Sequence, residues 1–160
     1  MRHHLKDCLS GAAAGGAMGI ALLLIMEFEG VRYAPYRDAG GVMTVCYGHT
    51  GPDIIPGKRY RPAECRALLE RDWATFSRVV DRAVSVPMSD YQRAALVSFS
   101  YNVGAAAFER STLLRQLNAG DKAGACASLR QWIYADGRPW KGLMRRREVE
   151  SEVCSWEQST

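Results

Sequence analysis

The 160-residue sequence has little histidine, no long basic run, no internal repeat and no low-complexity tract. Its histidines are His3, His4 and His49, which are too few for a zinc site built from three or four ligands. Residues 145–147 form its only cluster of basic side chains, so a net charge of +4 does not indicate a nucleic-acid-binding protein. These absences argue against a metal hydrolase or amidase, and the length predicts one globular domain.

Cysteine, by contrast, is abundant. Five cysteines in 160 residues are many for a cytosolic protein, in which thiols are kept reduced. The count therefore favours an oxidising compartment, with two disulfides and one cysteine left over.

One uncharged stretch, Leu9 to Met26, lies close to the amino terminus. Its 18 residues are just enough to span a bilayer as a helix. Arg2 and Lys6 precede it, so the positive-inside rule places the amino terminus in the cytoplasm. A cleaved signal peptide would need small residues after the apolar run, but Met26 leads directly into Glu27. We therefore expect this segment to be retained as an anchor.

The anchor is only weakly apolar, because ten of its 18 residues are Gly, Ala or Ser. Its Leu and Ile residues contribute only a few kcal/mol to insertion, at about 0.3–0.6 kcal/mol each. Gly11, Gly15 and Gly19 follow each other at four-residue spacing, which predicts a helix face suited to close packing. The segment can thus be an anchor that leaves the membrane, an ordinary anchor or a buried Ala/Gly helix.

The residues after the anchor carry the strongest chemical signal. Glu29, Asp38 and Thr44 form an E-x8-D-x5-T pattern around Gly40-Gly41. Cleavage of a sugar–sugar bond needs one carboxyl group to protonate the leaving oxygen and a second group to manage the nucleophile. Three simpler readings stay open: Glu27 as the acid, Asp38 as an ordinary turn residue, and Thr44 as plain strand packing.

Patterning predicts a mostly helical α+β domain with one small hairpin lobe. Residues 35–50 alternate in polarity around two glycines, as a β-hairpin does. Ser89 and Gln92 form a capping box at the start of a helix that Gly104 ends. The other predicted helices are one opening at Pro62 and those at about 111–118, 123–134 and 141–156.

The amino-acid sequence around this motif resembles that of phage-type lysozymes, the endolysins that cut bacterial cell walls. The resemblance begins with Glu29-Gly30, Tyr36-Arg37-Asp38, Thr44 and Tyr47-Gly48-His49-Thr50. It continues through Tyr101-Asn102-Val103-Gly104, Ser111-Thr112-Leu113-Leu114, Trp132, Gly142-Leu143 and Arg146-Arg147-Glu148, and so covers nearly the whole chain. The weak anchor resembles the signal-anchor-release segment of certain endolysins of lambdoid phages.

The resemblance implies a lysozyme-like α+β fold, with an anchor at residues 1–26 and a catalytic domain at residues 27–160. It implies an N-acetylmuramidase without cofactor or metal, in which Glu29 is the general acid, Asp38 stays ionised and Thr44 holds the attacking water. The sugar carbon would then be inverted. One arginine of the cluster at 145–147 is expected to pair with Glu29.

The same resemblance implies a life cycle and a set of partners. Host secretion machinery would export the chain, the bacterial inner membrane would hold it through residues 9–26, and depolarisation would release it to the periplasm. Its substrate would be peptidoglycan, with no nucleic acid, and the protein would be a monomer. The implied disulfides are Cys46–Cys65 and Cys126–Cys154, which leaves Cys8 over.

Two residues separate Met26 from Glu29, so a membrane-embedded anchor would hold Glu29 near the outer interface and keep the enzyme silent. Two alternatives remain open at this stage. A lytic transglycosylase uses a single acid and leaves an anhydro sugar. A non-enzymatic wall-binding or lysis-regulating protein would not need Glu29 at all.

Overall fold

The helix α4 (Asp90–Val103) forms the centre of the protein in the computed structural model, which describes residues 3–156. Three other long helices pack on it: α2 (Gly16–Glu29), α3 (Pro62–Ala83) and α8 (Lys141–Cys154). Because α4 is surrounded, apolar side chains occupy several of its faces, and its residues exposed by 1% or less include Ala94, Ala95, Leu96, Val97 and Phe99. A helix that is apolar on all sides is typical of a buried core position.

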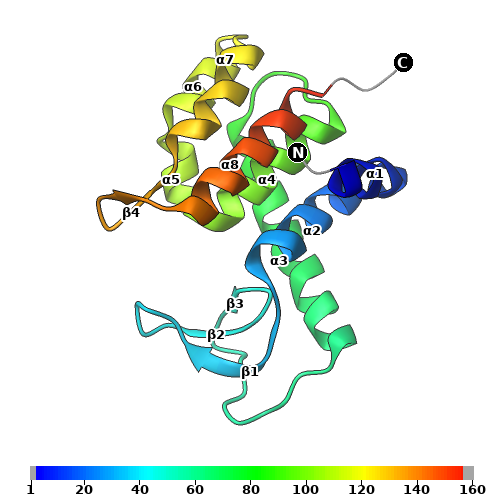
Figure 1. Cartoon of the computed structure of the whole chain (residues 1–160), viewed down its shortest axis with the longest axis vertical. Helices are drawn as coiled ribbons and strands as arrows, with labels where there is room; N and C mark the ends of the chain where they lie inside the picture. Colours follow the sequence, from blue (N-terminus) through cyan, green and yellow to red (C-terminus); the bar gives the residue numbers. More distant parts are fainter. Residues whose placement is uncertain (1–2, 157–160) are drawn as a thin grey trace.

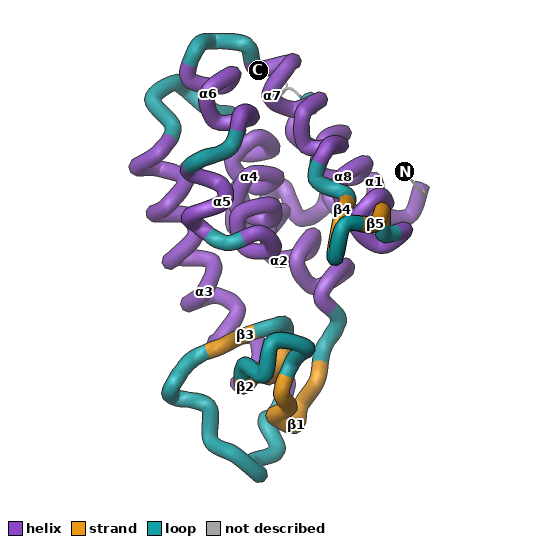
Figure 2. Tube along the Cα trace, turned by 90° about the vertical axis from the view of Figure 1, so that its left-hand side faces the viewer, coloured by secondary structure: helices purple, strands orange, loops and turns teal. Residues whose placement is uncertain are grey.

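A small sheet lies at one end of this helical body, at the bottom of Figure 1. It contains β1 (Arg32–Arg37), β2 (Met43–Cys46) and β3 (His49–Thr50), in antiparallel order β1-β2-β3. The chain enters the sheet from α2 and returns to the helical body through α3, as Figure 2 shows. The predicted α+β class is therefore confirmed.

Shorter elements complete the helical body. They are α1 (His3–Ala12), α5 (Ala105–Glu109), α6 (Thr112–Asn118), α7 (Lys122–Ser128) and 3-10 turns at Ala13–Gly15 and Leu129–Gln131. The predicted helix at 123–134 is wrong beyond residue 131, where a two-stranded hairpin follows instead, with β4 (Tyr134–Ala135) and β5 (Arg138–Pro139). Its turn residues Asp136 and Gly137 both have positive φ, of 50° and 73°. Asp-Gly is a strong hairpin signal in the sequence, and we overlooked it.

The amino-terminal segment is bent rather than straight. Residues His4–Glu29 are long and apolar enough to cross a membrane by length and composition alone. The chain nevertheless turns at Gly16, whose φ of 62° interrupts the helix, and α1 leaves the line of α2 (Figure 1). Only glycine adopts such a conformation without cost, so Gly16 permits the turn.

The glycine face of this segment packs less than expected. A β-carbon on Gly19 would lie 2.4 Å from the carbonyl oxygen of Ala12, so α2 needs a glycine here to let the backbone of α1 approach. At Gly11 and Gly15, by contrast, an added β-carbon would have no neighbour within 4 Å. The glycine needed at position 19 thus serves a contact within the amino-terminal segment itself, and packing of the glycine face in a membrane stays a prediction.

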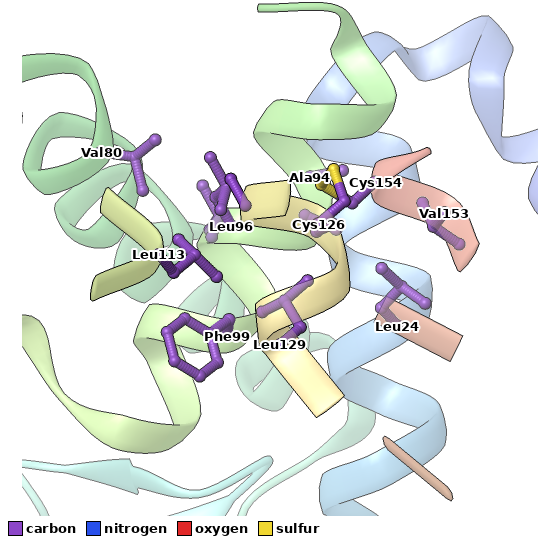
Figure 3. Close-up of a cluster of buried hydrophobic side chains, with 14 of the residues drawn as sticks. Leu24, Val80, Ala94, Leu96, Phe99, Leu113, Cys126, Leu129, Val153 and Cys154 are labelled. Carbon is purple, nitrogen blue, oxygen red and sulfur yellow. A yellow bond between two sulfur atoms is a disulfide. The ribbon is translucent and has the colours of Figure 1, made fainter. Parts of the chain in front are cut away.

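The apolar residues of the segment belong to the main core. Leu9, Ile20 and Leu24 are fully buried in the same cluster as Phe99 and Val153. Figure 3 shows Leu24 and Val153 among this cluster, together with Cys126 and Cys154. In this fold, part of the membrane-length segment therefore belongs to the structural core.

Both implied disulfides are present, Cys46–Cys65 and Cys126–Cys154. The first links the small sheet to α3, and the second links α7 to α8. Cys8 is half-buried with a free thiol, 3.1 Å from Nδ1 of His4.

Candidate active site

Glu29 is the last residue of α2, at the boundary between the helical body and the small sheet. Gly30 follows it with a φ of 64°, which ends the helix and turns the chain into β1. The Glu29 side chain is 23% exposed, and its Oε1 accepts a hydrogen bond from Arg146 of α8. The carboxyl group is therefore accessible to solvent while a buried cation holds it in place.

The turn between β2 and β3 approaches Glu29 from the other side. A β-carbon on Gly48 would lie 3.6 Å from Oε2 of Glu29 and 3.8 Å from the hydroxyl of Tyr101. That hydroxyl donates a 2.6 Å hydrogen bond to the carbonyl of Tyr47, which attaches the turn to α4. Burial, together with the negative charges of Asp72 and Glu29, raises the pKa of Tyr101, so its hydroxyl stays protonated as a donor.

Asp38 lies at the tip of the β1–β2 hairpin. Its Oδ1 accepts hydrogen bonds from the backbone N–H groups of Gly40 and Val42, both at 2.9 Å. This is the turn role that the sequence left open, and it also fixes the direction of the carboxylate. The Asp38 side chain is exposed, so a carboxylate with one oxygen engaged by the backbone faces solvent.

Thr44 lies on β2, opposite Tyr36 of β1. Its hydroxyl donates a 3.1 Å hydrogen bond to the carbonyl of Val42, the same residue whose N–H binds Asp38. Through Val42 the hairpin brings Asp38 and Thr44 together. Thr44 is only 4% exposed, so it also contributes to strand packing, as the simpler reading predicts.

The arginine cluster at the start of α8 divides into one surface and two buried side chains. Arg145 forms a 2.7 Å ion pair with Glu27, the rival candidate for the acid. Arg146 and Arg147 are 3% and 1% exposed, and Arg146 is the arginine that pairs with Glu29. The expected pairing is therefore confirmed for Arg146, and of the three arginines only Arg145 lies on the surface.

Glu150 is the site residue that sequence reasoning missed. It is fully buried and accepts hydrogen bonds from Arg146 Nε at 2.9 Å, Arg147 at 2.5 Å and the hydroxyl of Ser98 at 2.7 Å. Arg147 continues the network to Asn102, near the end of α4. The spacings i,i+4 and i,i+3 within one helix were the available signal, since such residues are neighbours on its surface.

His49 follows the turn that approaches Glu29, on β3, and is 5% exposed. Its Nδ1 lies 2.8 Å from Asp72 and its Nε2 lies 3.1 Å from Asp53. The hydrogen bond to Asp72 raises the pKa of His49 against the lowering effect of burial, and Asp53 adds to the increase. Arg71 and His49 in turn hold the pKa of Asp53 at about 2. Among residues 3–156, no group of three or more His, Cys, Asp or Glu side chains is arranged to hold a metal ion.

A cavity of about 690 Å³ lies next to the buried network. Arg147 and Asn102 form part of its wall, and Trp132 and Tyr134 add aromatic surface. The cavity thus joins the end of α4, the β4–β5 hairpin and α8, and it offers polar and aromatic groups to a ligand.

Comparison with known proteins shows the family and the fold of this chain. Residues 26–150 match the family model described as phage lysozyme. The chain is 53% identical over 158 residues to a protein of bacteriophage PS119 named SAR-endolysin, covering 95% of each chain. Among solved structures, it resembles the muramidase domain of SpmX from Asticaccaulis excentricus with a TM-score of 0.79, at 30% identity over 86% of this chain and 95% of that one.

A second solved structure, described as the active form of the P1 phage endolysin Lyz, shares the fold with a TM-score of 0.76. The identity is 24%, over 94% of this chain and 90% of that one. The family model and the SAR-endolysin match each cover most of this chain. The chain belongs to the phage lysozyme family.

Proposed function

We propose that this protein is an endolysin that hydrolyses the β-1,4 bond between N-acetylmuramic acid and N-acetylglucosamine in peptidoglycan. The observation that carries the proposal is Glu29, a partly exposed carboxyl group at the end of α2 that is held by the buried Arg146. A side chain fixed by a buried partner is ready to deliver a proton in one direction.

Each candidate residue has one role in this reaction. Glu29 protonates the glycosidic oxygen as the bond breaks. The Asp38 carboxylate supports the positive charge that develops on the sugar, while its Oδ1 is oriented by the backbone N–H groups of Gly40 and Val42. The Thr44 hydroxyl donates a hydrogen bond to the carbonyl of Val42, so the lone pairs of its oxygen remain free to accept a hydrogen bond from a water. This water attacks from the opposite face of the sugar and inverts the sugar carbon.

Membrane tethering gives the simplest control of this site. The helix that ends in Glu29 is also the second half of the membrane-length segment. While residues 9–26 span the inner membrane, α2 cannot pack on α4, and Glu29 cannot pair with Arg146. Release to the periplasm lets the segment bend at Gly16 and enter the core, which assembles the site.

The proposal includes an order of events and a set of partners. Host secretion machinery exports the chain with its amino terminus in the cytoplasm, and the domain that begins at about residue 27 folds in the periplasm. Depolarisation then releases a monomer that acts on the wall. The oxidising periplasm suits the two disulfides.

The deciding experiment measures reducing ends released from purified peptidoglycan by soluble full-length protein. Wild type is expected to release them, and a folded Glu29→Gln variant is expected to release none. Wall clearing by wild type without new reducing ends, with anhydro products by mass spectrometry, would indicate a lytic transglycosylase. Binding without clearing would indicate a regulatory protein.

Fractionation tests the membrane part separately. Uncleaved protein is expected in the membrane fraction of energised cells and in the soluble fraction after depolarisation. Protein that stays in the membrane fraction would contradict release.

A further inference from the structure

The carboxylate of Glu150 is the most deeply buried charge near the candidate acid. Its side chain is 0% exposed, and both of its oxygens are engaged, Oε1 by Ser98 and Arg146 and Oε2 by Arg147. A buried carboxylate is costly unless cations and donors compensate it, and here two guanidinium groups do so. Such an arrangement needs a reason beyond the stability of the helix.

Arg146 connects Glu150 to the surface. Its Nε binds Glu150, its NH1 binds Glu29, and its NH2 donates to the carbonyl of Ser98 at 3.0 Å. One guanidinium group therefore lies between a buried carboxylate and a partly exposed one. Burial lowers the pKa of Arg146, but the charges of Glu150 and Glu29 outweigh this effect and raise it, so Arg146 stays charged.

The charges around Glu29 decide how readily it holds a proton. Arg146 and Arg147 contribute two positive charges and Glu150 one negative charge, which leaves a net charge of +1 in the network. The other nearby groups add little: Arg145 is paired with Glu27 on α2, Tyr101 of α4 is neutral, and Asp72 of α3 is paired with His49 of β3. A neighbouring cation opposes protonation of a carboxyl group, whereas a nearby anion favours it.

We propose that Glu150 is a positioning residue for proton donation by Glu29: it fixes Arg146 in place behind the acid and offsets the charge of the second buried arginine, Arg147. This inference rests on the proposed function, since it concerns the acid of that reaction. Glu150 touches no substrate, and it acts on Glu29 only through Arg146. Without Glu150, the buried guanidinium groups of Arg146 and Arg147 would lose the carboxylate partner that they share behind Glu29.

The test compares two single variants and their double variant, each of which changes the net charge of the network, as full-length soluble protein. The measured quantity is the pH at which kcat/KM on soluble glycan strands falls on the alkaline side, called here the alkaline limb. Glu150→Gln raises the network charge to +2 and is expected to move the limb to lower pH by about one unit. Arg147→Gln lowers the network charge to zero and leaves Glu150 paired with Arg146, so the limb is expected to move to higher pH. The double variant restores +1 and is expected to bring the limb back towards the wild-type position.

A matched control is available on the same helix. Glu148 is exposed and paired with Arg130, so Glu148→Gln makes the same change of charge outside the network. It is expected to leave the limb within about 0.2 pH units of wild type, because exposed charges are strongly screened. Circular dichroism and thermal melting establish that each variant is folded.

Opposite shifts for the two single variants would support the proposal, since a loss of packing alone moves no limb in opposite directions. Folded, active variants whose limbs coincide with wild type, or shift in the same direction, would overturn it. If Glu150→Gln does not fold, Arg147→Gln decides alone through its upward shift. Wild type that releases no reducing ends at any pH would instead refute the proposed function itself.

Discussion

Gly19 offers the sharpest test of the bent amino-terminal segment. In the soluble fold an alanine β-carbon at this position would lie 2.4 Å from the carbonyl oxygen of Ala12. Carbon–oxygen contacts in proteins are about 0.9–1.2 Å longer than this, so α1 must move away from α2 in a Gly19→Ala variant. Overpacking of this kind costs about 1–3 kcal/mol, which corresponds to a fall in Tm of about 2–12 °C for a chain of this size.

The same substitution has no such cost in a straight membrane helix, where α1 and α2 are collinear and alanine is the better helix former. Gly19→Ala is therefore expected to retain more protein in the membrane fraction and to lower the Tm of the released form. Gly11→Ala is the matched control, because it changes the composition of the anchor identically but meets open space in the soluble fold.

The assay combines fractionation before and after depolarisation with thermal melting of the soluble protein. Equal Tm values for Gly19→Ala and Gly11→Ala would refute the reasoning, since the two variants differ only in the clash with Ala12. A lower Tm for Gly19→Ala with unchanged peptidoglycan cleavage at low temperature would show that the effect lies in stability alone.

Three further predictions follow from single contacts. Leu24→Ala is expected to lower the free energy of unfolding by about 2–5 kcal/mol, measured by denaturant titration, because Leu24 is fully buried in the main core; a loss below about 1 kcal/mol would contradict its place there. The pKa of His49 is raised in the folded protein, so its charged contacts stabilise the fold fully below about pH 6.5 and progressively less as the pH rises through the folded pKa. The Tm difference between wild type and His49→Gln is therefore expected to narrow from pH 6 to pH 9. A difference that widens over this range would contradict the raised pKa. Thr44→Val keeps the shape but removes the hydroxyl, and cleavage is expected to fall about 100-fold while Thr44→Ser retains activity; full activity of Thr44→Val would leave Thr44 with a packing role only.

Local patterns predicted several elements correctly. The capping box of Ser89 and Gln92 occurs as expected, with each side chain bonded to the other's backbone. Pro62 opens α3, and Gly40-Gly41 lies in the turn of the first hairpin. These signals act within four residues along the chain, so the sequence contains all the information that they need.

Secondary structure was predicted less reliably from local sequence patterns where two patterns competed. The apolar spacing after residue 123 suggested one helix to residue 134, although Asp136-Gly137 marked a hairpin. The disulfide pairs came from the resemblance, because spacing alone does not choose among cysteines that meet only after folding.

The sequence by itself determined the identities and spacing of Glu29, Asp38 and Thr44 and the membrane length of the segment before them, because these properties are carried by neighbouring residues. Only the tertiary structure decided that Leu9 and Leu24 enter the core, because the same sequence is compatible with a straight membrane helix and with a bent, buried segment. It also decided which arginine reaches Glu29, because Arg146 is 117 residues away in the chain and meets Glu29 only when α2 and α8 both pack on α4.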